Sequence, residues 1–168
     1  MKGWKIRSEK AEKAKVMKRR CERQNSYSVH LTEQWSWEKV ARYQEAINAA
    51  LKKYAQRFPD DVYLATIAEE LVRGQAQLWL AFKNKTQFSA FAITKVEITH
   101  TGKKRVILSD LAGEGGLDLV KLIDKVEEWA RTIHAEEMHM FGRPGWSKML
   151  SHHGYFRNLI HYRKVLVP

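Results

Sequence analysis

A predicted strand at residues 106–110, apolar at Val106-Ile-Leu, runs into the sequence Asp-Leu-Ala-Gly-Glu-Gly-Gly at 110–116, and apolar residues then recur at three- and four-residue spacing over 119–133. This order constrains the fold most, because a strand that passes through glycines into a helix presents backbone N–H groups at the start of that helix. Met-His-Met-Phe at 138–141 predicts a further strand. Two strands joined by a helix are expected to pair in parallel, in one sheet with helices on both faces.

The remaining pattern predicts short helices and strands after a polar link at 25–28. Helical spacing predicts one helix over 37–54, with Ser36 as N-cap, and a second over 61–72, capped by Asp60. Alternation and turn residues predict the other elements: strands over 78–82, 88–98 and 106–110, turns at 83–86 and 101–103, a helix over 146–152 and a strand over 158–167. The order is ααβββαβαβ, which indicates an α/β (α+β) fold with a mixed central sheet flanked by helices.

The positive charge is concentrated near the N-terminus. The 168 residues carry a net charge of +11, and residues 1–24 hold ten Lys or Arg and three Glu, so +7 of the total lies there. We assign residues 1–30 as a basic N-terminal arm or helix and 31–168 as one folded domain. The arm is expected to bind nucleic acid or an acidic protein surface, and a solubilising arm is the alternative. The residues for such contacts are Lys10, Lys13, Lys15, Lys18, Arg19, Arg20 and Arg23.

Composition excludes several other classes of protein. The single cysteine, Cys21, excludes an internal disulfide framework and a cysteine-rich zinc site. His134 and His139 flank the predicted strand over 138–141 without an acidic or cysteine ligand set near them in sequence, so we expect no metal site. No run of about eighteen apolar residues occurs, and we expect neither a membrane span nor a secretory signal.

The order of elements and the glycine junction resemble the GNAT-type N-acetyltransferase superfamily over about residues 36–167. In that family a Gln/Arg-x-x-Gly-x-Gly/Ala loop wraps the pyrophosphate of acetyl-CoA. Residues 110–115 keep both glycines, but an aspartate replaces Gln/Arg and a glutamate lies between the glycines, so negative charge opposes the pyrophosphate. The resemblance implies acetyl-CoA as the one cofactor, and its binding residues would be Leu108, Gly113, Glu114, Gly115 and Gly116.

The catalytic residues implied by this resemblance are Asp110 and His152. The family's closing helix reads Leu-Tyr-x-x-x-Gly-Phe, and its tyrosine often reprotonates the CoA thiolate. Here Gly154-Tyr155 ends the segment and Leu150 stands at the tyrosine position, so His152 is the substitute acid or else an exposed helix end. Asp110 is the candidate general base. Its alternatives are a cap of the following helix or an ion pair with Arg143.

A narrower resemblance, to phage and prophage proteins of GNAT-like fold, lies in residues 77–81, the glycine loop at 111–116, residues 126–131, and residues 142–150, which begin with Gly-Arg-Pro-Gly-Trp. It implies residence in the virion or host cytoplasm, with other phage structural proteins or nucleic acid as partners. Two functions are open. One is a divergent or catalytically inactive acyltransferase fold that serves as a structural or nucleic-acid-associated virion component. The other is an active acetyl-CoA-dependent N-acetyltransferase that acts on an amine of a protein, small molecule or nucleobase.

Overall fold

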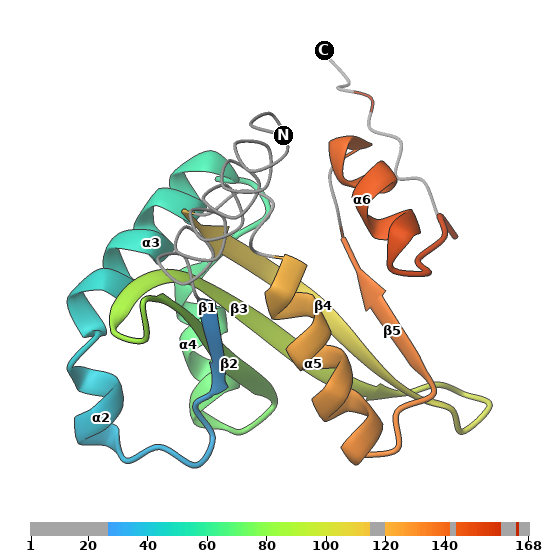
Figure 1. Cartoon of the computed structure of the whole chain (residues 1–168), viewed down its shortest axis with the longest axis horizontal. Coiled ribbons are helices and arrows are strands. Elements are labelled where there is room, and N and C mark those ends of the chain that lie inside the picture. Colours follow the sequence, from blue (N-terminus) through green and yellow to red (C-terminus); the bar gives the residue numbers. More distant parts are fainter. Residues whose placement is uncertain (1–26, 115–119, 142–143, 159–163, 165–168) are drawn as a thin grey trace, which may run out of the picture.

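The computed structural model describes residues 27–114, 120–141, 144–158 and 164 (Figure 1). Its elements follow one another as β1 (Tyr27–Leu31), α2 (Trp37–Ala41), α3 (Gln44–Arg57), α4 (Leu64–Val72), β2 (Ala76–Lys83), β3 (Gln87–Ile98), β4 (Lys104–Gly113), α5 (Val120–Thr132), β5 (Glu137–Met140), the 3-10 turn η2 (Pro144–Trp146) and α6 (Ser147–His152). Within these ranges, no helix has the length and apolar character needed to cross a membrane.

Five strands form one sheet in the order β1-β2-β3-β4-β5. The strands from β1 to β4 are antiparallel neighbours, whereas β4 and β5 are parallel, as the helix between them predicted. Asn84 and Lys85, with φ of 53° and 70°, form the turn before β3, and Gly102, with φ of 83°, lies in the turn before β4. Positive φ is typical of compact hairpin turns. The mixed sheet of the predicted α+β fold is therefore confirmed.

Helices cover both faces of this sheet (Figure 1). On one face α5 buries Leu122, Ile123 and Val126, each at most 1% exposed, in a cluster that we call the α5-side core. On the other face α3 and α4 pack over residues that include Phe82 and Phe91, in the α3/α4-side core. Each face of the sheet therefore has its own core, and side chains that alternate along a strand belong to one or the other.

A buried chain of hydrogen bonds joins two strands on the α5 side. Trp79 Nε1 donates to Thr94 Oγ1 at 3.0 Å, and the Thr94 hydroxyl donates to Gln77 Oε1 at 3.1 Å. The Trp79 ring also meets the edge of the Trp129 ring of α5, with centroids 5.5 Å apart. Since a buried polar group without a partner costs about 1–3 kcal/mol, these satisfied bonds favour the observed register of β2 against β3.

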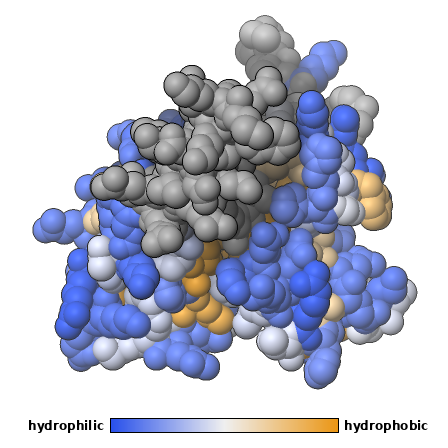
Figure 2. All heavy atoms as spheres, in the orientation of Figure 1, coloured by the Kyte–Doolittle hydropathy of each residue, from blue (hydrophilic) through white to orange (hydrophobic). Residues whose placement is uncertain are grey.

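The outer side of α5 is hydrophilic. Lys125 pairs with Glu128, and Arg131 pairs with Glu127 at 2.9 Å, each within one turn of the helix. The face drawn in Figure 2 is correspondingly mostly hydrophilic, with an apolar strip beside the grey atoms. The amphipathic pattern that predicted this helix is therefore confirmed over its described residues.

Two predicted helices have different bounds in the structure. The helix expected over 37–54 is divided, because α2 ends at Ala41 and α3 begins at Gln44, with Tyr43 between them at φ −108° and ψ 3°. The Tyr43 ring lies 4.7 Å from the Phe82 ring, so packing on the sheet accompanies the break. The second helix begins at Leu64 with Tyr63 as N-cap, so the predicted cap at Asp60 is wrong.

One strand was not predicted at all. Strand β1 pairs with β2 from Tyr27 opposite Lys83 to Leu31 opposite Trp79, so residues 27–30 of the proposed arm are part of the sheet. The observed order therefore begins with a strand before the helices. The strand predicted over 158–167 lies mostly outside the described residues, as do all the proposed arm contacts from Lys10 to Arg23.

Candidate active site

Strand β4 extends beyond its parallel partner. The two strands pair from Arg105 opposite Glu137 to Leu108 opposite Met140, where β5 ends, and β4 continues to Gly113. Figure 1 shows the strands diverging from that point. Among the described residues no strand pairs with the end of β4 on this side. Its backbone groups can therefore hydrogen-bond a ligand that lies along the strand as another strand would.

A β-bulge interrupts β4 where this unpaired edge begins. Ile93 of β3 pairs with Asp110 and Thr94 pairs with Leu108, so Ser109 has no partner residue on β3. Ser109 Oγ lies 2.6 Å from Asp110 Oδ2 and 3.3 Å from the Ile93 carbonyl oxygen, and both can accept from the hydroxyl. A bulge bends the strand and interrupts its hydrogen-bond ladder, so the irregular backbone and the Asp110 carboxylate lie where the unpaired edge begins.

Asp110 lies within β4 and not in the loop after it. The predicted strand ended at residue 110, but the strand continues to Gly113, and α5 is described only from Val120. Asp110 is therefore not the cap of α5, and that alternative is wrong. The proposed partner Arg143 lies outside the described residues. Because Asp110 pairs with Ile93 of the α3/α4-side core, its side chain is on the α3/α4 side of the sheet.

Packing against β3 requires a glycine at position 113. A Cβ atom there would lie 2.3 Å from Ala90 Cβ and 2.4 Å from the Ser89 carbonyl oxygen, far below the ordinary contact of about 3.5–4.0 Å. The strand pairing thus explains Gly113 without a cofactor. Leu108, also expected near the cofactor, is 3% exposed in the α5-side core, so its side chain is a core residue.

Glu114 is directed toward α3. Its Oε1 lies 3.8 Å from Lys53 Nζ, and the two side chains are 89% and 80% exposed. Its backbone N–H donates to the Ser89 carbonyl at 2.8 Å, and Ser89 Oγ donates to the Glu114 carbonyl. Such an exposed pair contributes at most about 1 kcal/mol, but it offsets part of the charge that the sequence placed against a pyrophosphate. Gly115 and Gly116 lie outside the described residues.

The closing helix α6 holds no protic side chain at the predicted tyrosine position. Leu150 packs against the α5-side core, so this position is filled by an apolar contact. His152 is exposed at the last residue of α6, which agrees with the helix-end alternative. Its neighbour His153 lies with Nδ1 3.3 Å from Asp124 Oδ1 of α5. Among the described residues, His152 therefore has no contact that favours the role of a proton donor.

Tyr155 connects the segment after α6 to α5. Its hydroxyl donates to Glu127 Oε1 at 2.8 Å, and Glu127 also accepts from Arg131. Burial, followed by the hydrogen bond to this carboxylate, raises the pKa of Tyr155 above its usual range. A phenol with a raised pKa is a weaker acid. Tyr155 is accordingly a structural donor and does not replace the family's tyrosine.

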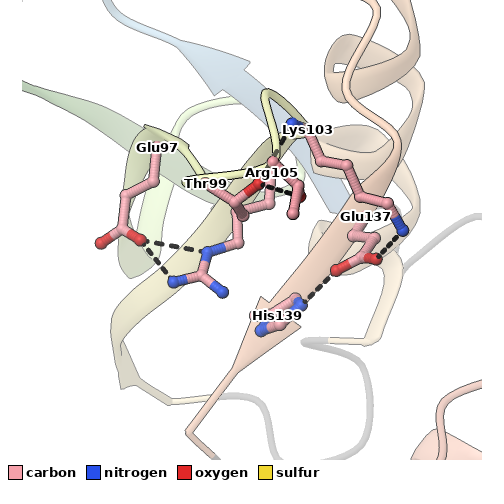
Figure 3. A network of polar contacts seen from close by, with 7 residues as sticks. Glu97, Thr99, Lys103, Arg105, Glu137 and His139 are labelled. Carbon is pink, nitrogen blue, oxygen red and sulfur yellow. Dashed lines mark hydrogen bonds and ion pairs between the residues drawn. The ribbon is translucent and has the colours of Figure 1, made fainter.

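A polar network lies on β5 (Figure 3). Met138 and Met140 pack against the α5-side core, so Glu137 and His139 point to the opposite side by strand alternation. His139 Nε2 lies 2.9 Å from Glu137 Oε2, and Lys103 Nζ lies 3.3 Å from Glu137 Oε1. An imidazole that is paired with a carboxylate beside the diverging strands has the chemistry of a general base.

His139 was expected from the sequence only as a possible metal ligand, and its neighbour Glu137 was overlooked. The available signal was the alternation of polar and apolar residues at 137–140, which places the glutamate and the histidine two apart on one face of a strand. The described residues contain no group of three or more His, Cys, Asp or Glu side chains that could hold a metal ion.

Solved structures that share this fold include several described as acetyltransferases. One, described as a probable acetyltransferase, has a TM-score of 0.59 at 16% identity, over 85% of this chain and 97% of its own. A putative acetyl transferase from Pyrococcus furiosus has a TM-score of 0.57 at 16% identity, over 84% and 100%. An aminoglycoside N-acetyltransferase in complex with CoA has a TM-score of 0.57 at 17% identity, over 83% and 95%. No protein-family model matches the sequence, and no curated protein is similar to it.

The chain therefore has the GNAT fold, an acyltransferase-like fold with a mixed sheet between two helical layers. This confirms the fold that the order of elements and the glycine junction predicted. At 16–17% identity the likeness concerns the fold alone. The roles of Asp110, His152 and the residues around Gly113 stay predictions.

Proposed function

We propose that this chain is an acyl-CoA-dependent N-acyltransferase that binds acetyl-CoA, or a related acyl-CoA, along the unpaired edge of β4. One observation supports it above the others: β4 combines this edge with the bulge at Ser109, in a fold whose solved examples include an acetyltransferase in complex with CoA. The pantetheine arm of CoA contains amide groups, which can hydrogen-bond to a strand edge as a peptide does.

The residues around the edge fit such a ligand. The contact of Lys53 with Glu114 offsets negative charge after β4, and Asp110 points to the α3/α4 side, opposite to the face on which α5 packs. When bound, the acyl-CoA supplies an electrophilic thioester carbonyl. In this proposal, backbone N–H groups at the bulge polarise that carbonyl. An acceptor amine then forms the C–N bond while the C–S bond breaks, and a base takes the amine proton.

Binding and transfer test this proposal separately. Calorimetry with acetyl-CoA is expected to show saturable binding, weakened about tenfold or more in Gly115→Val, because a side chain there obstructs the approach of backbone to a phosphate. Gly145→Ala is the control, since a Cβ atom at Gly145 meets nothing within 4 Å. The absence of binding at millimolar acetyl-CoA would refute the proposal.

The acceptor is an amine of a protein, a small molecule or a nucleobase. A first panel consists of glucosamine 6-phosphate, the aminoglycoside sisomicin and a lysine-rich peptide mixture. The first two are named for solved acetyltransferases of this fold. Acetylated product is measured by mass spectrometry, together with release of the CoA thiol. Transfer to an amine with thiol release in equal amounts is the expected result.

A second candidate is a GNAT-fold protein without acyl transfer, which serves as a structural or nucleic-acid-associated component of a phage virion. Leu150 in the core at the family's tyrosine position, together with the +7 charge of residues 1–24, favours it. Binding to DNA through these residues would fall steeply as salt rises. Deletion of residues 1–24 should abolish this binding at low salt and leave the melting temperature unchanged. Equal binding by the shortened chain would exclude the basic arm as the contact.

A further inference from the structure

Over the part of the chain that the structure describes, α3 and α4 cover the β4–β5 pair less than they cover β2 and β3. On the α5 side the core is filled by α5 together with Leu150 and Tyr155. On the other side α3 contacts β3 and β4, where Ala112 joins the α3/α4-side core, and α4 contacts β2. Farther along the sheet that side carries partly exposed charges, such as Arg105 and Glu97 at 32% and 45% exposed. An acceptor that approaches a thioester on β4 therefore has room on the α3/α4 side.

His139 lies close to the bulge on this same side. It pairs with Ile107, which is two residues before Ser109 on the neighbouring strand. With a rise of about 3.3 Å per residue and a strand spacing of about 4.8 Å, its Cα is on the order of 8 Å from that of Ser109. An amine that attacks a carbonyl held at the bulge can therefore lie between the bulge and the imidazole ring.

The neighbours of His139 fix which ring nitrogen can accept a proton. A hydrogen bond from Nε2 to Glu137 Oε2 at 2.9 Å makes Nε2 the donor and leaves Nδ1 as the acceptor of the neutral ring. Hydrogen bonds from His139 and then Lys103 lower the pKa of Glu137, which keeps this carboxylate charged. Arg105 of β4 lies opposite Glu137 in register, but its guanidinium pairs with Glu97 at 2.7 Å.

We infer that His139 is the general base of the proposed acyl transfer and that Glu137 positions its ring. This inference rests on the proposed function. The amine nitrogen bonds to the acyl carbon, the C–S bond breaks with its electron pair on the CoA sulfur, and the amine proton passes to Nδ1 of His139. Asp110 is on the same side, but one of its carboxylate oxygens accepts from the Ser109 hydroxyl. The ring, 33% exposed, can return its proton to water.

Four variants of the full chain test this assignment. His139→Gln removes the base, Glu137→Gln removes the charge that orients it, and Asp110→Asn removes the competing carboxylate. His100→Gln is the matched control, an exposed histidine in the turn between β3 and β4. Each variant is compared with wild type in acetyl-CoA binding by calorimetry, and in acetyl transfer to the three amines of the panel between about pH 5.5 and 9.5, where an imidazole changes its charge.

The expected result separates chemistry from binding. His139→Gln should lower kcat about 100-fold, keep acetyl-CoA affinity, and remove the fall of the rate toward acid pH that reports an essential base. Glu137→Gln should lose about tenfold and keep this fall, because the base is still present. His100→Gln should match wild type. An unchanged rate and pH profile in His139→Gln overturns the inference while the proposed function stands. Loss of the acid limb in Asp110→Asn instead assigns the base to Asp110. Absence of acetyl-CoA binding by wild type at millimolar ligand overturns both.

Discussion

Replacement of Gly113 by alanine tests whether strand packing or a ligand requires this glycine. The new Cβ atom would lie 2.3 Å from Ala90 Cβ and 2.4 Å from Ala90 Cα and from the Ser89 carbonyl oxygen. Ordinary contacts begin at about 3.5 Å, so the two strands must separate by more than about 1 Å. Ala90 is completely buried, and two of the three obstructing atoms belong to the backbone, so no side-chain rotation relieves the contact.

Overpacking of this kind costs about 1–3 kcal/mol. For a chain of this size each kcal/mol lowers the melting temperature by about 2–4 °C, so Gly113→Ala should melt about 2–12 °C below wild type without any ligand. Gly145→Ala, which meets no atom within 4 Å, should stay within about 0.5 kcal/mol of wild type. Thermal unfolding followed by circular dichroism measures both. A Gly113→Ala chain as stable as the Gly145→Ala control would contradict the packing argument, and a defect confined to acetyl-CoA binding would return Gly113 to the ligand site.

Two further substitutions test the polar contacts of the α5 side. Thr94→Val leaves Trp79 Nε1 and Gln77 Oε1 without their hydroxyl partner, so it should lower the free energy of unfolding, measured in urea, by about 1–3 kcal/mol. Thr94→Ser keeps the hydroxyl and should lower it less. Equal losses in the two variants would contradict the role of the hydroxyl. Tyr155→Phe should cost about 1 kcal/mol at neutral pH. Because the pKa of Tyr155 is raised in the folded chain, its contribution to the free energy of unfolding is complete below the unfolded pKa of about 10 and declines above it. The stability difference between Tyr155→Phe and wild type should therefore shrink above about pH 10. A stability difference that grows instead would contradict the assignment.

The elements that the sequence predicted well have local signals. The turns at 83–86 and 101–103 depend on residues that accept positive φ, and the helix after the glycine junction depends on its own apolar spacing. The parallel pairing of β4 with β5 follows from that helix by connectivity. These features need no knowledge of distant contacts, and all of them are confirmed in the described residues.

The elements that were missed depend on contacts that are distant in sequence. Strand β1 is only five residues long, and its hydrogen bonds are to β2, about fifty residues farther along the chain. The division between α2 and α3 accompanies the contact of Tyr43 with Phe82, which also crosses a long stretch of sequence. Helical spacing continues through Tyr43, so the sequence pattern alone contained no sign of the break.

Several features of the candidate site could not be predicted from the sequence. The sequence identified the strand that reaches Gly113, yet ended that strand at Asp110 and treated the following residues as a loop. The bulge at Ser109 is a feature of register between two strands, and no residue type marks it. His139 likewise becomes a candidate base only through its contact with Glu137 and its position beside β4, because an isolated histidine on a short strand is an ordinary surface residue.

The two departures from the family pattern concern different parts of the reaction. Asp110 replaces Gln or Arg in the sequence pattern, but its side chain lies on the α3/α4 side, opposite to the face on which α5 packs. In the proposed acyl transfer, its charge would therefore face the acceptor more than a pyrophosphate. Leu150 stands where the family has the tyrosine that protonates the departing thiolate, so only this acid is missing. A thiolate is itself a competent leaving group near neutral pH. Neither change removes the bulged, unpaired edge of β4 on which carbonyl polarisation depends. The proposed transfer reaction would thus need a base on the acceptor side and no protein acid on the thiol side.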